Sequence, residues 1–196
     1  MKKFLSILLI SFYLTNTSHA NDIKDFQIEG MSIGDSLLDY MSEEEILNNK
    51  RNYFKEKRKY YVVGIYNNLE VYEVVDVYLK TKDKRYIIKT IGGMKNTRDL
   101  RECLSQKKAI KKEFDEIFSS LETAEHTRSH DFDKTGESKQ YQTVYYFGDG
   151  SKRDNHIRIE CDSWSEKIKK ENEFNDGLNI VAMTTEILDW VYSDYK

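Results

Sequence analysis

The sequence predicts an α+β fold, an antiparallel sheet with helices packed on one face. Short segments rich in β-branched and aromatic residues recur between tight turn signals, which is typical of antiparallel strands. One long segment, 99–121, carries apolar residues at helical spacing. The order of helix then three strands occurs twice. The prediction is therefore a single domain over 21–196, with 27–93 and 97–196 as two tandem helix-plus-three-strand units within it.

The first twenty residues have the layout of a cleavable secretory signal peptide. Two lysines precede an apolar run over 4–14, and Ser18 and Ala20 place small residues before a cut between Ala20 and Asn21. The run is shorter than the roughly 20 residues that span a bilayer, although an uncleaved N-terminal anchor is the alternative. No Cys lies near the cut. The pattern predicts a periplasmic or secreted protein without a transmembrane segment in the mature chain.

The first half opens with a lead-in over 21–34 and a short turn of helix over 36–40. Ser42 and Glu45 form a capping-box pattern that starts a second short helix. Three strands are then expected, over 60–66, 69–80 and 85–91. The pair Gly92-Gly93 is expected to break the chain after the third strand.

The second half begins with the 99–121 helix, followed by a polar segment over 122–140 that is expected to be a flexible loop. Strands are predicted over 141–147, 156–161 and 177–183. In the second of these strands, Ile157, Ile159 and Cys161 face inward, while Arg158 and Glu160 face outward. A capping-box pattern from Ser163 starts a helix that ends near residue 172, and a closing helix covers 184–195.

The two cysteines, Cys103 and Cys161, both lie in the mature chain. An even pair in an exported protein predicts a disulfide bond, and two free buried thiols are the alternative. Two distant cysteines do not supply the four ligands of a structural zinc site.

Composition restricts the function classes. Cleavage would remove Lys2 and Lys3 but no acidic residue, which changes the net charge from −3 to −5. A mildly acidic chain argues against a nucleic-acid partner. The motifs of P-loop, dinucleotide-binding and nucleophile-elbow proteins do not occur. We therefore expect no catalytic residues and no cofactor, and hence not an enzyme.

The 122–137 segment contains the candidates for metal chemistry, His126, His130, Asp131 and Asp133. Two histidines four residues apart would share one face of a helix. The string from Asp131 to Thr135 matches D-x-D-x-T, the nucleophile motif of haloacid-dehalogenase phosphatases and the start of a calcium loop. However, no buried strand precedes it, and Gln142 stands where a calcium loop needs Glu. A hydrolase or metal-binding protein that uses these carboxylates and histidines is the alternative function, and a solvated loop is the simpler interpretation.

The segment 28–46, IEGMSIGDSLLDYMSEEEI, resembles the opening of uncharacterised exported bacterial proteins. More distantly it is similar to the opening of SmpA/OmlA (BamE-like) and β-lactamase-inhibitor-protein-like domains, in which such a segment leads into two short helices and an antiparallel sheet. The resemblance implies a non-enzymatic, protein-binding fold of the cell envelope. It implies no functional residue here, and the lipidated Cys of BamE-like proteins is missing.

These observations predict an exported, non-catalytic protein that binds an envelope protein or a small ligand. Several tyrosines of the predicted strands could line the binding groove, and half-buried sheet residues are the alternative. The tyrosines are Tyr60, Tyr61, Tyr66, Tyr72, Tyr78, Tyr145 and Tyr146.

Overall fold

The computed structural model describes residues 22–51, 59–150 and 154–194. The predicted signal peptide and its cleavage site, Ala20 and Asn21, lie outside these residues. Within the described part of the chain, none of the helices has the length and apolar character needed to cross a membrane.

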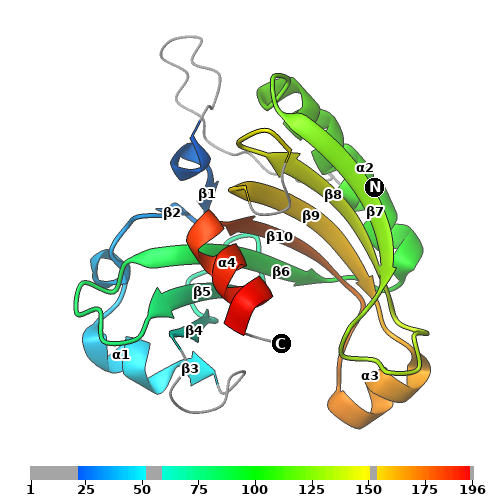
Figure 1. Ribbon diagram of the computed structural model, residues 1–196. Helices are drawn as coiled ribbons and strands as arrows, with labels where there is room; N and C mark the ends of the chain where they lie inside the picture. The colour runs from blue at the N-terminus through cyan, green and yellow to red at the C-terminus, as the bar shows by residue number, and fades with distance from the viewer. Residues whose placement is uncertain (1–21, 52–58, 151–153, 195–196) are drawn as a thin grey trace, which may run out of the picture.

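A twisted eight-stranded antiparallel sheet forms the centre of the molecule (Figure 1). Its strand order is β3-β4-β5-β6-β10-β9-β8-β7, and the predicted α+β class is confirmed. The strands are β3 (Lys50–Arg51), β4 (Tyr60–Ile65), β5 (Val74–Lys80), β6 (Ile88–Asn96), β7 (Glu122–Ser129), β8 (Lys139–Tyr146), β9 (His156–Ser163) and β10 (Gly177–Met183). Before them, β1 (Gln27–Ile28) and β2 (Met31–Ser32) form a separate two-stranded ribbon.

The pairing of β6 with β10 joins the two halves of the chain in one sheet. These strands are paired from Gly177 opposite Asn96 to Met183 opposite Thr90. Helix α2 (Leu100–Ile117) carries the chain from β6, in the middle of the sheet, to β7 at its far edge. The chain then returns strand by strand, so that β10 closes the centre.

One face of the sheet is covered by α2 and by the N-terminal elements η1 (Ile23–Asp25), β1, β2, η2 (Leu37–Asp39) and α1 (Glu43–Asn48). The main hydrophobic core lies here. It includes alternate residues of β9 and β10, such as Ile157, Ile159 and Ile180, and the ring cluster of Phe114, Phe118 and Tyr145. The disulfide bond between Cys103 and Cys161, which the sequence predicts, fastens α2 to β9 on this face, with a Cα–Cα distance of 5.8 Å.

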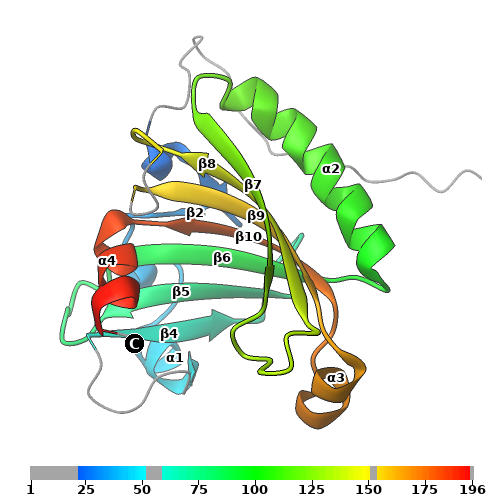
Figure 2. The same cartoon turned by 45° about the vertical axis from the view of Figure 1, so that its right-hand side comes forward.

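The opposite face carries α4 (Thr185–Asp194) across one end of the sheet, whereas α2 lies on the other side (Figure 2). Ile187 and Trp190 of α4 are buried against Tyr60, in a second apolar cluster. The prediction placed the helices on one face, and α4 differs because its apolar side chains pack against Tyr60, Tyr78 and Met183 of the sheet. We call this side of the sheet the open face, because the other described helices do not cover it.

Several local predictions were wrong. The segment 122–140 is a loop only over 130–138, because residues 122–129 form β7, which pairs along its whole length with β8. As an edge strand it is almost entirely exposed, so its sequence lacks the apolar alternation that marks half-buried strands. Gly92 and Gly93 do not break the chain either, because both lie inside β6. The Tyr72 ring occupies the side-chain position of Gly93, where a Cβ would lie 2.6 Å from it.

The capping box at Ser42 is present as predicted. The Ser42 amide donates to the Glu45 carboxylate at 2.8 Å, and the Ser42 hydroxyl accepts from the Glu45 amide at 3.3 Å. Together these bonds satisfy two backbone donors at the start of α1.

Candidate functional site

The open face contains two adjoining hollows. The central hollow, about 250 Å³, lies over β5, β6, β10 and β9, and the edge hollow, about 430 Å³, lies over β7, β8 and β9 beside α4. Both are open to solvent. Arg158 and Met183 line both of them, so the two form one continuous groove, which we call the open-face groove.

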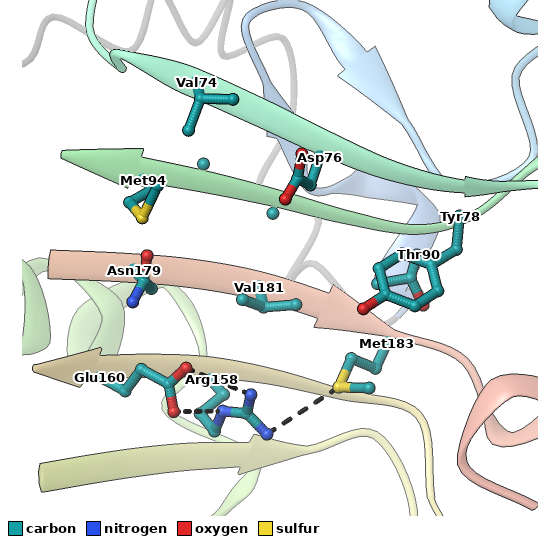
Figure 3. Close-up of a pocket in the computed structure, with 12 residues that line it drawn as sticks. Val74, Asp76, Tyr78, Thr90, Met94, Arg158, Glu160, Asn179, Val181 and Met183 are labelled. Atoms are coloured by element: carbon teal, nitrogen blue, oxygen red, sulfur yellow. Dashed lines mark hydrogen bonds and ion pairs between the residues drawn. The ribbon is translucent and has the colours of Figure 1, made fainter. Parts of the chain in front are cut away.

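Strand register explains the shape of the central hollow. Asp76, Gly92, Val181 and Arg158 stand opposite one another on four successive strands. Gly92 has no side chain and Val181 has a short one, so the surface is depressed in the middle of these four residues. Asp76 and Arg158 put a charged side chain at each end. Figure 3 shows Asp76 and the Arg158–Glu160 pair on opposite sides of the hollow, with Val181 between them.

Arg158 and Glu160 form a bidentate ion pair along β9. Arg158 Nε lies 2.9 Å from Glu160 Oε2, and Arg158 Nη2 donates to Oε1 at 3.3 Å. Gln142 on β8 donates to Oε2 at 2.8 Å. Burial alone would lower the pKa of Arg158, but the carboxylate of Glu160 outweighs it, and the pKa is raised. The guanidinium is therefore charged and fixed in direction.

Asp162, the next residue on the same side of β9, is a buried carboxylate that accepts hydrogen bonds from two side-chain amides. Gln140 Nε2 donates to Oδ1 at 2.8 Å, and Asn179 Nδ2 donates to Oδ2 at 2.6 Å. Arg128 Nε in turn donates to Gln140 Oε1 at 3.0 Å, so a polar chain crosses β7, β8, β9 and β10. Burial, and next the charge of Glu160, raise the pKa of Asp162 to about 7.

The edge hollow is lined by both apolar and polar side chains. Val144, Tyr146, Leu188 and Tyr192 line it together with His126, Arg128 and Asp131 from β7 and the loop that follows. His156 lies at its base, where burial lowers the pKa to about 4 and keeps the imidazole neutral near pH 7. The groove thus has a charged central half and an amphipathic edge half.

The two candidate histidines are not brought together. His126 is on β7, and four residues of extended chain separate side chains by about 13 Å rather than placing them one helical turn apart. His130 instead lies against Trp164, with 4.1 Å between ring centroids, and its Nδ1 accepts a hydrogen bond from the Phe132 amide. Burial lowers the pKa of His130.

The two candidate aspartates have different positions. Asp131 lines the edge hollow, whereas Asp133 is buried and organises its own loop. The Asp133 carboxylate accepts hydrogen bonds from Thr135, Ser138 and Ser165, which hold its pKa below the ordinary range. Ser165, not Ser163, caps α3 (Glu166–Asn172). Across the described ranges, no group of three His, Cys, Asp or Glu side chains could hold a metal ion.

The strand tyrosines divide between the two faces. Tyr78 lines the central hollow and Tyr146 the edge hollow, whereas Tyr60 packs on Trp190. Tyr72 and Tyr145 belong to the covered face.

The sequence prediction missed the set of polar side chains on β8 and β9 that line or adjoin the groove. Its signal is the alternation of polar residues on β8 and β9, where Arg158 and Glu160 face outward as predicted and yet Glu160 is buried.

No protein-family model matches this chain, and neither the curated proteins nor the solved structures include a match to it.

Proposed function

We propose that this chain is an exported, non-catalytic protein that binds a polypeptide partner in the open-face groove. The observation that carries the proposal is the groove itself, which is formed by side chains already fixed through strand pairing and hydrogen bonds. Arg158, Glu160 and Asp162 are held before any partner arrives, so binding would cost little ordering of these groups.

The dimensions of the groove favour a polypeptide over a small molecule. The central hollow, at about 250 Å³, is below the roughly 300–1,000 Å³ of typical small-molecule sites. The edge hollow is larger, but it continues into the central hollow as one open surface. An open surface that mixes apolar, aromatic and arginine side chains is typical of protein–protein interfaces.

The non-catalytic part of the proposal rests on the pairing of the charged groups. The carboxylate of Glu160 is bound by Arg158 and Gln142, and that of Asp162 by two amides. Neither Ser nor Cys is among the described residues that line the two hollows. Glu160 is a poor general base because Arg158 favours its ionised form, and Asp162 is not among the side chains that line either hollow.

Export is supported by the pattern of residues 1–20 and by the Cys103–Cys161 bond, since disulfides persist in oxidising compartments. The resemblance of residues 28–46 to exported envelope proteins favours the same location, periplasmic or secreted, and an envelope protein as the partner.

Site-specific photo-crosslinking in the cells that make the protein tests this function. A benzophenone side chain replaces Met94 in the central hollow, and a matched control replaces Leu104 on α2. These two side chains have nearly equal exposed fractions, 36% and 37%, on opposite sides of the sheet. We expect polypeptide adducts at position 94 and not at 104. Adducts at neither position, or equally at both, would contradict the proposal, and adducts of small-molecule mass would replace the polypeptide with a small ligand.

A further inference from the structure

We infer that the partner places a basic side chain, arginine ahead of lysine, in the central hollow between Asp76 and Glu160. This inference rests on the proposed function, because it names the chemistry of the partner at the same groove. Three observations carry it: the balance of charge, the shape of the hollow, and a hydroxyl group that has no hydrogen-bond partner among the described residues.

The balance of charge around the central hollow is negative. Asp76 and Glu160 line it and are each paired with one guanidinium group, and Asp162, next to Glu160 along β9, adds a third carboxyl group that is partly ionised near pH 7. Arg51 Nε lies 3.0 Å from Asp76, and Arg158 pairs with Glu160.

The third carboxylate, Asp162, is in no ion pair among the residues that the structure describes. It is held by the amides of Gln140 and Asn179, and the exposed Arg128 reaches it through Gln140. Burial and the charge of Glu160 disfavour ionisation of Asp162, so a cation from outside would be bound together with the ionised form of this carboxyl group.

The shape of the hollow suits one long side chain. Gly92 and Val181 make a low apolar floor, and Met94 and Met183 add thioether side chains. Asp76 and Glu160 lie on opposite sides of Val181 (Figure 3). Arg and Lys pack an aliphatic stem against apolar surface while the charged end reaches polar groups. The volume of about 250 Å³ limits the occupant to a side chain rather than a larger group.

The Thr90 hydroxyl is the independent observation. Thr90 lines the hollow and is only 1% exposed, and its Oγ1 has no hydrogen-bond partner among the described residues. Buried polar groups in proteins are nearly always hydrogen-bonded. A guanidinium carries five donors and an ammonium three, so an arginine can pair with a carboxylate and still donate to another acceptor in the hollow. Arginine is for this reason the preferred occupant.

Selection from a displayed heptapeptide library on the purified chain, residues 21–196, tests the inference. We expect arginine, and less often lysine, to be enriched at one position relative to the unselected library. Replacement of that arginine by citrulline, which keeps the shape and removes the charge, should weaken binding about tenfold or more. This measurement uses the unaltered protein, so it does not depend on the folding of any variant.

Variants then locate the site. Glu160→Gln and Asp76→Asn should each weaken the selected arginine peptide about tenfold, while Glu166→Gln, a side chain 93% exposed on α3, should leave it unchanged. Val181→Trp fills the hollow and should abolish binding, with melting temperature as the check on folding.

The outcomes distinguish a failure of this inference from a failure of the proposed function on which it rests. Peptides that Val181→Trp blocks but that lack a preferred basic position would overturn the inference and leave the proposed function standing. Peptides that bind with equal affinity to the Val181→Trp variant, or no selected peptides at all, would count against both.

Discussion

Arg158 and Glu160, two residues apart on β9, hold each other through two contacts, with 2.9 Å between Nε and Oε2. Their side chains are only 20% and 6% exposed. Removing Arg158 would leave Glu160 and Asp162 buried together without that cation. We expect Arg158→Met to lower the free energy of unfolding by about 3–5 kcal/mol, measured by urea denaturation at pH 7. Arg101→Met, which alters a side chain 93% exposed, is the control, and equal stability of the two variants would refute this expectation.

Asp162 should make stability depend on pH. Its folded pKa of about 7 lies above the unfolded value of about 3.9, so the folded state binds more protons between them. The stability that protonated Asp162 contributes is complete below about pH 4 and is lost as the pH rises through about 7. His156, with a pKa lowered to about 4, acts in the opposite direction over part of this range, so the useful quantity is a difference.

We expect Asp162→Asn to melt close to the parent protein at pH 5 and a few degrees higher at pH 8, because 1 kcal/mol corresponds to about 2–4 °C for a chain of this size. Arg158, Glu160, Gln140 and Asn179 face this side chain and remain in place. A difference between the two proteins that does not grow with pH would show that Asp162 is not the titrating group.

The Cys103–Cys161 bond closes a loop with a sequence separation of 58. In the chain-entropy model such a loop is worth about 4 kcal/mol. We expect the double variant Cys103→Ala, Cys161→Ala to melt about 10 °C lower than the oxidised protein. Alkylation of the unreduced protein after unfolding should label neither cysteine, and labelling of both would contradict the bond.

Neighbouring glycines of β6 should respond differently to the same change. A Cβ on Gly93 would meet three atoms of the Tyr72 ring at 2.6–2.7 Å, whereas one on Gly92 would meet a Val181 methyl at 3.1 Å. Gly93→Ala should therefore cost about 1–3 kcal/mol, and Gly92→Ala less than about 1 kcal/mol. Thermal melting of both variants checks this order, and the reverse order would show that the Tyr72 ring does not cover Gly93.

Substitutions of Asp133 and Asp131 distinguish a loop held together by hydrogen bonds from a metal-binding site. Asp133→Ala should lower the melting temperature because Thr135, Ser138 and Ser165 lose their acceptor, while Asp131→Ala should not. Millimolar Ca²⁺, Mg²⁺ or Zn²⁺ should leave the melting temperature of the parent protein unchanged. A metal-dependent rise that Asp131→Ala abolishes would revive the hydrolase or metal-binding alternative.

The sequence predicted elements whose local pattern and burial agree. Helix α2 has a clear apolar stripe, and the predicted bounds of β10 are those of the structure. Strand β7 was missed because an exposed edge strand needs no apolar residues, and its pairing depends on β8 rather than on its own composition.

The groove was predicted in part only. Alternation assigned Arg158 and Glu160 to the outward side of β9, but their burial depends on neighbours far away in the chain. Asp76 lies across the groove from Arg158 only because β6 pairs with β10, and Asn179 lies opposite Glu160 because β10 pairs with β9. These contacts join distant segments of the chain, so no local sequence pattern predicts them.

The place of β10 in the sheet sets an order for assembly. A chain delivered from its N-terminus completes β4, β5 and β6 long before residues 177–183 arrive, so the inner edge of β6 must wait unpaired. Contacts between distant segments form slowly, because the intervening chain must first be ordered. The centre of this sheet therefore closes last, and a chain cut short before residue 177 would keep two part-sheets without the strand that unites them.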